Sequence, residues 1–313
     1  MSMHEMTRRL FLGSLGAGLV RPEVRTRAAG QAQAPGAGAG GGMVEKDVVY
    51  GRGGDTDLHC DVYRPSGTST KRMAIIHFHG GGFAAGNKNN LAERLKSLSA
   101  RGYVNVAAQY RLAGVAKWPA QMEDVKASIR WTRANAATLG IDPARIAVAG
   151  YSAGGHLALF AAGTQNRQEF EGKSGNAGVG TEVAAWVAYF AVTGPAWNGF
   201  TKQFPMPEGS SEEAWRLATP GTYVKSFPPT LLFHGLADTT VPPESSQDFL
   251  QLLRQANVAS ELHTFAGVPH EFVSIPEFSE STAALVDFFL ERHVINPRTY
   301  PAFGAGRQGR PGV

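Results

Sequence analysis

The sequence predicts an α/β fold in which helices cover both faces of a mostly parallel sheet. Short apolar runs alternate along the chain with segments of helical periodicity, a pattern typical of such folds. Several runs are continuous, as expected for strands buried on both faces, and no internal repeat is visible. The 313 residues are enough for one large domain or two smaller ones, and 43% of them are hydrophobic, which allows an ample core.

The predicted strands begin with a pair at a sheet edge. Residues 44–51 and 57–65 alternate apolar and polar side chains, which favours two short edge strands. The runs "RMAIIHFHGGG" and "YVNVAAQYRL" each hold a continuous apolar stretch and predict two buried strands. Four further strands are predicted over residues 145–150, 183–191, 229–235 and 259–265.

The predicted helices separate these strands. The longest, "PAQMEDVKASIRWTRANAATLG", begins at Pro119 and stops at Gly140, and it places Val125, Ile129 and Thr132 on one face. Proline suits the start of a helix and glycine its end, so these boundaries agree with the periodicity. Further helices are predicted over residues 90–101, 153–163, 243–257 and 279–293.

Other segments are expected to lie outside this regular alternation. Residues 194–228 are rich in proline, glycine and aromatics, and we interpret them as an insertion over the top of the sheet with one short helix near Ser211–Leu217. The glycine-rich stretches 30–42 and 303–312 cannot bury enough apolar surface to offset the entropy lost on ordering. We therefore predict an export signal with a linker over residues 1–42, a folded domain over residues 43–295 and a loose tail over residues 296–313.

The N-terminal stretch "MTRRLFLGSLGAGLV" resembles a twin-arginine export signal, an address that a receptor reads. Its apolar run from Leu10 to Val20 is too short to cross a bilayer about 30 Å thick at about 1.5 Å per residue, so no stable membrane insertion is expected. We expect the twin-arginine export machinery as a partner and a periplasmic or extracellular location. The alternative is a disordered basic tail.

Charge and cysteine content argue against several classes of function. The net charge is +4, but residues 1–27 hold five arginines against two glutamates, so the rest of the chain is nearly neutral. It has no basic run interleaved with aromatics, which argues against nucleic-acid binding. The single cysteine, Cys60, excludes an internal disulfide and disfavours a cysteine-based metal site, and we interpret it as a small buried strand residue.

A nucleophile is predicted at Ser152. The residues Gly150-Tyr151-Ser152-Ala153-Gly154 match the pattern G-x-S-x-G and stand between a predicted strand and a predicted helix. This context indicates a nucleophile elbow, a sharp turn that holds the serine in strained backbone geometry. The two glycines are needed there because strand and helix come too close for a Cβ.

A second glycine-rich stretch, "HGGGF" from His79 to Phe83, closes the earlier buried strand. Such a loop can direct backbone N–H groups toward the oxygen of a carbonyl under attack. We expect an oxyanion hole formed by the N–H groups of Gly81, Gly82 and Ala153. The alternative is a plain turn.

A serine nucleophile needs a base, and the base needs an acid that orients it. After a nucleophile elbow, the chain order is serine, then an acid, then histidine. "TLLFHGLADTTVP" ends a predicted strand with Asp238 in the loop beyond it, and "LHTFAGVPHEF" ends the next strand with His270 in its loop. Ligands bind at the carboxyl ends of parallel strands, so we expect a triad of Ser152, His270 and Asp238.

Other acids and histidines are interpreted as surface or structural residues. Glu271 and Asp248 are rival acids, but neither ends a strand, so we expect both at the solvated surface. His234 lies within an apolar strand and His263 alternates with apolar neighbours, which favours structural roles for both. His156 lies one turn into the helix after the nucleophile, and its spacing directs it away from the serine hydroxyl.

These motifs and their order resemble the α/β-hydrolases of the hormone-sensitive-lipase-like and bacterial feruloyl and acetyl-xylan esterase groups. The resemblance covers about residues 45 to 293 through "FHGGGF", "QYRL", "WPAQMEDVKASIRW", "GYSAGGHLA", "HGLADTTVP" and "GVPHEF". It implies an α/β-hydrolase fold with a mostly parallel central sheet, helices on both faces and a short insertion over the active site. It also implies that Ser152 is the nucleophile, His270 the base and Asp238 the acid that orients it. The oxyanion donors that it implies are the N–H groups of Gly81, Gly82 and Ala153.

The chain departs from the pattern of these groups in three respects. Only a short strand pair precedes "HGGG", so the long N-terminal cap of the lipase-like group is missing, which favours the capless esterases of the second group. Tyr151 stands where an acidic residue is common, and Glu271 stands where glycine is frequent. The resemblance further implies that Asp124 is structural and that Arg111 packs and forms an ion pair.

The expected function is hydrolysis of a carboxylic ester through an acyl-enzyme, with no metal and no organic cofactor. The substrate is a small-molecule or polysaccharide ester: short acyl esters, acetylated or feruloylated plant polysaccharide and synthetic polyesters all stay open. Trp197, Phe200 and Phe204 of the insertion are candidates for an acyl pocket or for simple core. Two alternatives remain, a peptidase or amidase of the prolyl-oligopeptidase type and an inactive hydrolase-like binding module.

Overall fold

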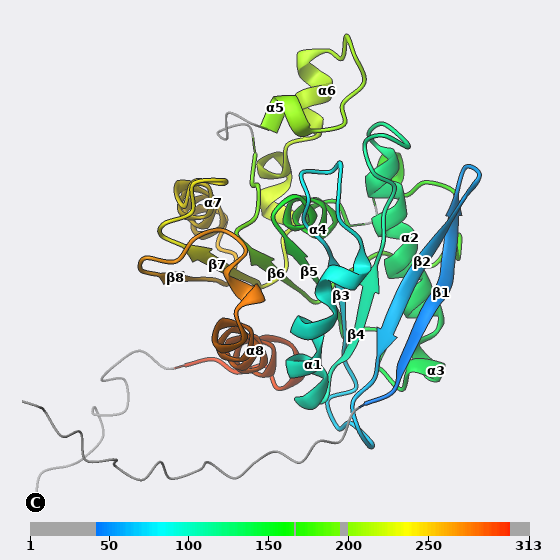
Figure 1. The fold of residues 1–313 in the computed structure, drawn as a ribbon, viewed down its shortest axis with the longest axis vertical. Helices are drawn as coiled ribbons and strands as arrows, with labels where there is room; N and C mark the ends of the chain where they lie inside the picture. Colours follow the sequence, from blue (N-terminus) through cyan, green and yellow to red (C-terminus); the bar gives the residue numbers. More distant parts are fainter. Residues whose placement is uncertain (1–41, 166, 195–199, 301–313) are drawn as a thin grey trace, which may run out of the picture. The chain divides into compact units, whose positions relative to one another are not determined.

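The computed structural model describes residues 42–300 except 166 and 195–199. The described residues form an eight-stranded sheet in the order β1-β2-β4-β3-β5-β6-β7-β8 (Figure 1). In chain order these strands span Val44–Gly53, Thr56–Tyr63, Ala74–Phe78, Val104–Ala108, Ile146–Tyr151, Ala185–Tyr189, Thr230–Gly235 and Ser260–Phe265. Sequence thus located every one of these strands to within a few residues.

The sheet is antiparallel at one end and parallel elsewhere. β1 pairs antiparallel with β2, and β2 pairs antiparallel with β4, which confirms the predicted edge pair. All pairs from β4 across to β8 are parallel. Phe78 of β3 stands opposite Gly150 of β5, so the loops that follow these two strands start at the same level. This register brings the "HGGGF" loop beside the predicted nucleophile.

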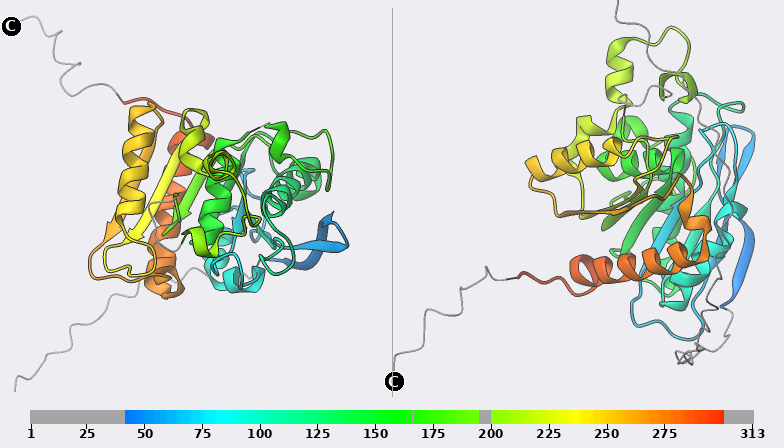
Figure 2. Two further views of the ribbon diagram at one scale, coloured as in Figure 1. Left: turned by 90° about the horizontal axis from the view of Figure 1, so that it is seen from above. Right: turned by 60° about the vertical axis from the view of Figure 1, so that its left-hand side comes forward.

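Helices connect the strands and cover both faces of the sheet (Figure 2). Helices α1 to α8 span Ala92–Ala100, Ala120–Ala134, Ala136–Leu139, Ala153–Gly163, Phe200–Gln203, Glu212–Leu217, Glu244–Gln255 and Pro276–Leu290. Short 3₁₀ segments η1 to η4 lie at Lys88–Leu91, Gln168–Phe170, Pro220–Ser226 and Phe272–Ser274. A π-helical segment, η5, follows α8 at Glu291–Ile295.

Two apolar cores lie on the two faces of the sheet. Helices α2, α4 and α7 pack on one face through side chains that include Ile129, Leu157 and Phe249. Helices α1 and α8 pack on the other face through side chains that include Leu95 and Val286. Every residue of β3, β4, β5, β6 and β7 is buried. Burial on both faces explains why these strands are continuous apolar runs in the sequence.

Some helices differ from their predicted limits. The helix expected over residues 119–140 is divided at Asn135 into α2 and α3. The last helix begins at Pro276, earlier than expected, because proline fits the first turn of a helix, where its missing N–H is not needed. The short helix of the insertion is confirmed as α6, and the Ser211 side chain caps its first turn. Helix α5 and segment η3 also lie in the insertion and were not predicted.

The remaining expectations concern the chain ends, Cys60 and membrane insertion. Residues 1–41 and 301–313 lie outside the described residues, so the export signal, the linker and the tail stay predictions. Cys60 is fully buried in β2, as expected, and burial raises the pKa of its thiol to about 12. Among the helices of the described residues, none is both long and apolar enough to cross a bilayer.

Candidate active site

Ser152 lies in the turn between β5 and α4 and has a strained backbone. Its φ of 52° and ψ of −118° fall outside the regions that L-residues prefer. A Cβ on Gly150 would overlap the Gly154 carbonyl, and a Cβ on Gly154 would overlap the carbonyl oxygens of Phe78 and His79. Only glycine fits at these two positions, which confirms the close approach of strand and helix predicted from the sequence.

The start of α4 presents backbone N–H groups beside the serine. The helix begins at Ala153, and the first N–H groups of any helix have no carbonyl partner within it. The helix N-terminus also carries a partial positive charge, which favours an anion at this point. The N–H of Ala153 is therefore available to a ligand that bears negative charge.

The "HGGGF" loop after β3 is fixed in a tight, left-handed conformation. Gly81 and Gly82 have φ values of 117° and 58°, which glycine adopts without strain. The Gly81 carbonyl accepts hydrogen bonds from the N–H groups of Ala84 and Ala85, at 3.1 and 2.9 Å. Within the described part of the chain, the N–H groups of the two glycines bond to no acceptor. The loop can therefore direct both donors into the cavity that Ser152 lines.

The predicted acid and base are in direct contact. His270 Nδ1 lies 2.6 Å from Asp238 Oδ2, so the imidazole N–H donates to the carboxylate. This bond orients the ring and leaves Nε2 able to accept a proton. The His270 ring also packs edge-on against Phe190, with the ring centres 4.5 Å apart.

Asp238 is buried and all of its hydrogen bonds are made by the protein. Oδ1 accepts from the backbone N–H groups of Thr240 and Val241 at 2.8 and 2.9 Å, and Oδ2 accepts from both His270 and His234. Burial acts to raise the pKa of Asp238, but the hydrogen bonds from His234, His270 and the Val241 N–H outweigh it. They hold this pKa well below its usual range, so the carboxylate is charged at neutral pH.

His234 contacts the acid directly, which the sequence did not reveal. Its Nε2 lies 3.1 Å from Asp238 Oδ2 and 3.0 Å from the Val241 carbonyl oxygen, and its Nδ1 lies 2.7 Å from Ser246 Oγ. A ring that donates from Nε2 and accepts at Nδ1 satisfies all three partners. The prediction that His234 is a buried strand residue is confirmed. Strand alternation alone could not show that its ring reaches the loop beyond the strand.

One cavity of about 200 Å³ joins the predicted site residues. Ser152, His270 and the three expected oxyanion donors all line it, and Asp238 lies behind His270. The rest of the lining is the apolar Val192 and three polar side chains, Gln203, Thr240 and Glu271. The structure therefore brings together segments that follow β3, β5, β7 and β8, as the sequence predicted.

One of the two rival acids has a role at the site that the sequence did not reveal. The Glu271 side chain is 46% exposed, as a solvated acid should be, but it also lines the cavity, and its Oε2 lies 2.6 Å from Arg94 Nη2. The chain bends immediately after His270, so the next residue stays beside the site. Asp248 is exposed on α7, as expected.

The residues expected to be structural lie away from the cavity. His156 is buried in α4, and its Nδ1 lies 3.2 Å from the Val192 carbonyl oxygen. Arg111 and Asp124 form an ion pair with a closest distance of 2.7 Å, as the resemblance implied. His263 lies partly exposed on the edge strand β8.

Of the three aromatic side chains proposed for an acyl pocket, Phe204 is described, and it belongs to the core. Phe204 is buried, and its ring contacts those of Phe83, Trp118 and His156. None of these rings lines the cavity. Trp197 and the side chain of Phe200, which were the other candidates for an acyl pocket, lie outside the described residues.

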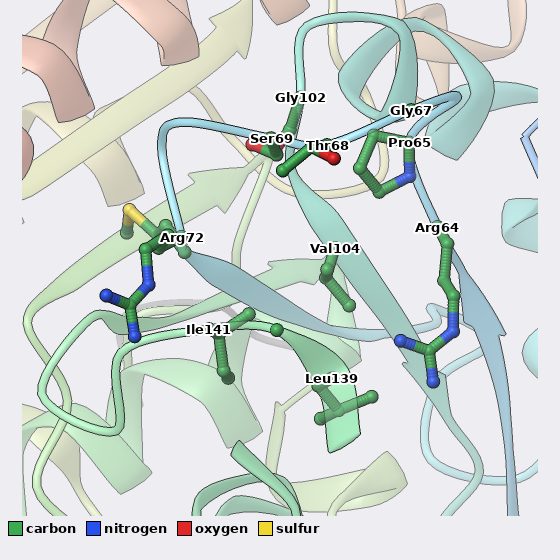
Figure 3. A pocket seen from close by; sticks show the side chains of 12 residues that line it. Arg64, Pro65, Gly67, Thr68, Ser69, Arg72, Gly102, Val104, Leu139 and Ile141 are labelled. Atoms are coloured by element: carbon green, nitrogen blue, oxygen red, sulfur yellow. The ribbon is translucent and has the colours of Figure 1, made fainter. Parts of the chain in front are cut away.

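A second cavity, of about 180 Å³, lies at the amino ends of β3 and β4 (Figure 3). Arg64 and Arg72 flank it, and Val104, Leu139 and Ile141 form its apolar side. It holds none of the predicted site residues, which gather at the carboxyl ends of the strands. Among the described residues, no group of histidine, cysteine, aspartate and glutamate side chains is arranged to hold a metal ion.

Comparison with known proteins identifies the family. The BD-FAE family model matches residues 60–253. LipM of Mycobacterium tuberculosis, a probable carboxylic ester hydrolase, is 29% identical over 287 residues, which cover 85% of this chain and 64% of LipM. The chain therefore spans slightly less than two thirds of that relative.

Solved structures agree with the family match. Esterase 2 of Thermogutta terrifontis, phosphorylated by paraoxon, has a TM-score of 0.69 and 28% identity, and the match covers 82% of this chain and 96% of that one. A truncated carbohydrate esterase from gut microbiota has a TM-score of 0.68 and 28% identity, and the match covers 82% of this chain and 98% of that one. Together with the sheet order and the strained strand-to-helix turn at Ser152, these matches show that the chain belongs to the BD-FAE family and has the α/β-hydrolase fold.

Proposed function

We propose that this chain hydrolyses carboxylic esters through an acyl-enzyme. The observation that carries the proposal is the arrangement around Ser152. Ser152 lies in a strained turn and lines the same cavity as His270. The Nδ1 atom of His270 is hydrogen-bonded to the charged Asp238. The esterases among the similar proteins support the same reaction class. We assign the role of nucleophile to Ser152, that of base to His270 and that of orienting acid to Asp238. The N–H groups of Gly81, Gly82 and Ala153 are the oxyanion donors.

In the first half of the reaction, Ser152 Oγ attacks the carbonyl carbon of the ester. His270 Nε2 takes the hydroxyl proton, and Asp238 stabilises the imidazolium that forms. The three oxyanion donors bind the negative charge on the carbonyl oxygen, and removal of one such donor typically costs about 2.7–4 kcal/mol of transition-state stabilisation. The proton then passes from His270 to the alcohol oxygen, the C–O bond breaks and the alcohol leaves.

In the second half, water enters and attacks the acyl group on the serine. His270 Nε2 takes a proton from this water, and the oxyanion donors again bind the carbonyl oxygen. The same proton returns to Ser152 Oγ as the acid leaves. These steps balance without a metal or an organic cofactor.

The size and lining of the cavity support esters with a short acyl group. A volume of about 200 Å³ is smaller than the range of about 300–1,000 Å³ that is usual for drug-sized ligands. Its polar side chains suit a hydroxylated alcohol better than a long alkyl chain. We therefore propose short acyl esters, including esters of plant polysaccharides, as the substrate class.

We also propose that the protein is exported by the twin-arginine machinery to a periplasmic or extracellular location. The support is the sequence alone, in which paired arginines precede a short apolar run. An exported esterase would meet polymeric esters or their fragments outside the cytoplasm. Cys60 is the only cysteine, so the chain forms no internal disulfide. Its folding before export therefore does not depend on disulfide formation.

Replacing the nucleophile tests the proposed function. Ser152→Ala should abolish turnover of p-nitrophenyl acetate and leave the fold intact, since a smaller side chain enters a site that already accommodates serine. Circular dichroism checks the fold. Ser66→Ala, at an exposed position between β2 and β3, is the matched control and should keep full activity. Residual turnover near that of the wild type would refute the assignment of Ser152.

Two further measurements separate the proposal from its alternatives. A fluorophosphonate probe should label the wild type but not Ser152→Ala, whereas an inactive binding module would take no label. Hydrolysis of a p-nitrophenyl ester should be far faster than hydrolysis of the matched anilide. Equal rates on the two would favour a peptidase or amidase instead.

A further inference from the structure

Glu271 occupies a backbone conformation that disfavours its side chain. It follows His270 directly and has a φ of 60° and a ψ of 18°, in the left-handed region. A residue with a Cβ loses about 1–2 kcal/mol there, whereas glycine does not. Backbone strain of this kind is concentrated at functional sites. A glutamate that stands in this conformation beside the proposed base is therefore a candidate for a specific role.

One oxygen of Glu271 is firmly held. Its Oε2 accepts a hydrogen bond of 2.6 Å from Arg94 Nη2, and Arg94 itself is largely buried in α1. The Arg94 guanidinium also lies 4.8 Å from the ring centre of Tyr151, the residue before the nucleophile. This double anchor fixes the position of the carboxylate relative to the nucleophile.

The other oxygen is left free and faces the site. Among the described residues, Glu271 Oε1 has no hydrogen-bond partner. A Cβ built on Gly80 would lie 3.3 Å from Glu271 Oε1 and 3.3 Å from Ser152 Cβ. Both atoms therefore border the same small space beside Gly80. Glu271 thus presents a charged hydrogen-bond acceptor to the cavity, a short distance from the nucleophile.

The chemistry of the reaction decides which half of the ester meets this acceptor. The leaving oxygen must come within hydrogen-bond reach of His270 Nε2 to receive its proton. The atoms attached to that oxygen therefore lie on the His270 side of the cavity, next to Glu271. The acyl oxygen points toward the N–H groups of Gly81 and Gly82.

We propose that Glu271 is a specificity-determining residue that selects esters whose alcohol carries a hydroxyl next to the scissile oxygen. That hydroxyl donates to Glu271 Oε1. Thr240 and Gln203 are further polar side chains of the same cavity, and Gln203 Oε1 lies beside Gly82. An alkyl alcohol of the same size offers no donor, so it forgoes the hydrogen bond to a charged group that the hydroxylated alcohol gains. The proposal rests on the ester hydrolysis proposed above and assigns its preference for the alcohol to one side chain.

Two esters of equal size test the proposal. 2-Hydroxyethyl acetate and propyl acetate have the same number of non-hydrogen atoms and differ only in a terminal hydroxyl or methyl group. The wild type should give a higher kcat/KM with 2-hydroxyethyl acetate. In Glu271→Ala the ratio of the two kcat/KM values should fall about 10-fold, the effect of losing one hydrogen bond to a charged group. Glu271→Gln keeps a neutral acceptor and should give an intermediate ratio.

A second variant and a matched control protect the test against misfolding. Glu271→Gly removes the side chain and also relieves the left-handed strain, which offsets part of the loss of the ion pair with Arg94, so it should fold better than Glu271→Ala and show the same fall in the ratio. Glu280→Gln breaks a comparable surface ion pair, with Arg101, away from the cavity and should leave the ratio unchanged.

The outcomes distinguish this inference from the proposed function. If the wild type hydrolyses both esters and Glu271→Ala and Glu271→Gly keep the wild-type ratio, the role of Glu271 is overturned while ester hydrolysis stands. A fall in activity that is equal for both esters also overturns it, because it indicates a general structural role. If the wild type hydrolyses neither ester, the proposed function fails first.

Discussion

Asp238→Asn would reverse the direction of the hydrogen bond that orients His270. Asp238 Oδ1 accepts from two backbone N–H groups, those of Thr240 and Val241, so an oxygen must stay at that position. The amide nitrogen of asparagine therefore takes the place of Oδ2 and faces His270 Nδ1. It donates where the wild-type carboxylate accepts. The imidazole must then carry its proton on Nε2, and in that form it cannot take the proton of Ser152.

The expected effect on the rate is large and that on the fold is small. Loss of the correct tautomer in a serine–histidine–aspartate triad lowers kcat about 10⁴-fold, which corresponds to about 5.5 kcal/mol of barrier. The fold is preserved because both backbone hydrogen bonds to Oδ1 remain. His234, which also faces the new amide, can adapt by donating from Nδ1 to Ser246 and accepting at Nε2, at the cost of its hydrogen bond to the Val241 carbonyl.

The assay is kcat for p-nitrophenyl acetate at pH 7.5, with the thermal unfolding midpoint measured in parallel. Asp248→Asn is the matched control, because it makes the same substitution at an exposed acid on α7, and it should keep full activity. A kcat for Asp238→Asn within 10-fold of the wild type would refute the tautomer argument. So would an equal loss in the Asp248 control.

Two further predictions concern stability. Gly154→Ala should yield little or no soluble folded protein, because its Cβ would overlap the carbonyl oxygens of Phe78 and His79; soluble expression equal to the wild type would contradict this. Burial lowers the pKa of His77 and of His79 to about 4, and that of His156 to about 3, so below pH 6.5 the unfolded chain binds protons that the folded chain does not. The free energy of unfolding should therefore fall between pH 6.5 and pH 4.5, by about 2 kcal/mol for each histidine. An unchanged urea midpoint over this range would contradict the argument.

The fold and the location of the site could be predicted because both follow from local patterns. Strands buried on both faces appear as continuous apolar runs, and the crowded elbow can be built only with small residues around Ser152. The triad candidates Asp238 and His270 each follow a predicted strand. Parallel strands end at one edge of the sheet, so these loops had to meet. Chain order and strand direction together were enough for this part.

Contacts between distant side chains could not be predicted in the same way. His234 looked like a buried strand residue, and nothing local indicated that its ring reaches Asp238. Glu271 was interpreted as a surface acid because it does not end a predicted strand. Its place in the cavity depends on a left-handed backbone and on Arg94, which is far away in the sequence. Such a pairing is a property of the assembled sheet, and a single sequence carries no signal for it.

The insertion that carries Gln203 leaves the sheet after β6 and returns before β7, two strands that are hydrogen-bonded to each other. Its ends are thus held at a fixed spacing whatever lies between them. Doubling the length of a flexible connection adds only about 0.6 kcal/mol of closure entropy. Related chains could therefore lengthen, shorten or exchange this segment and acquire new substrates. The reacting groups in the loops after β5, β7 and β8 would keep their relative positions.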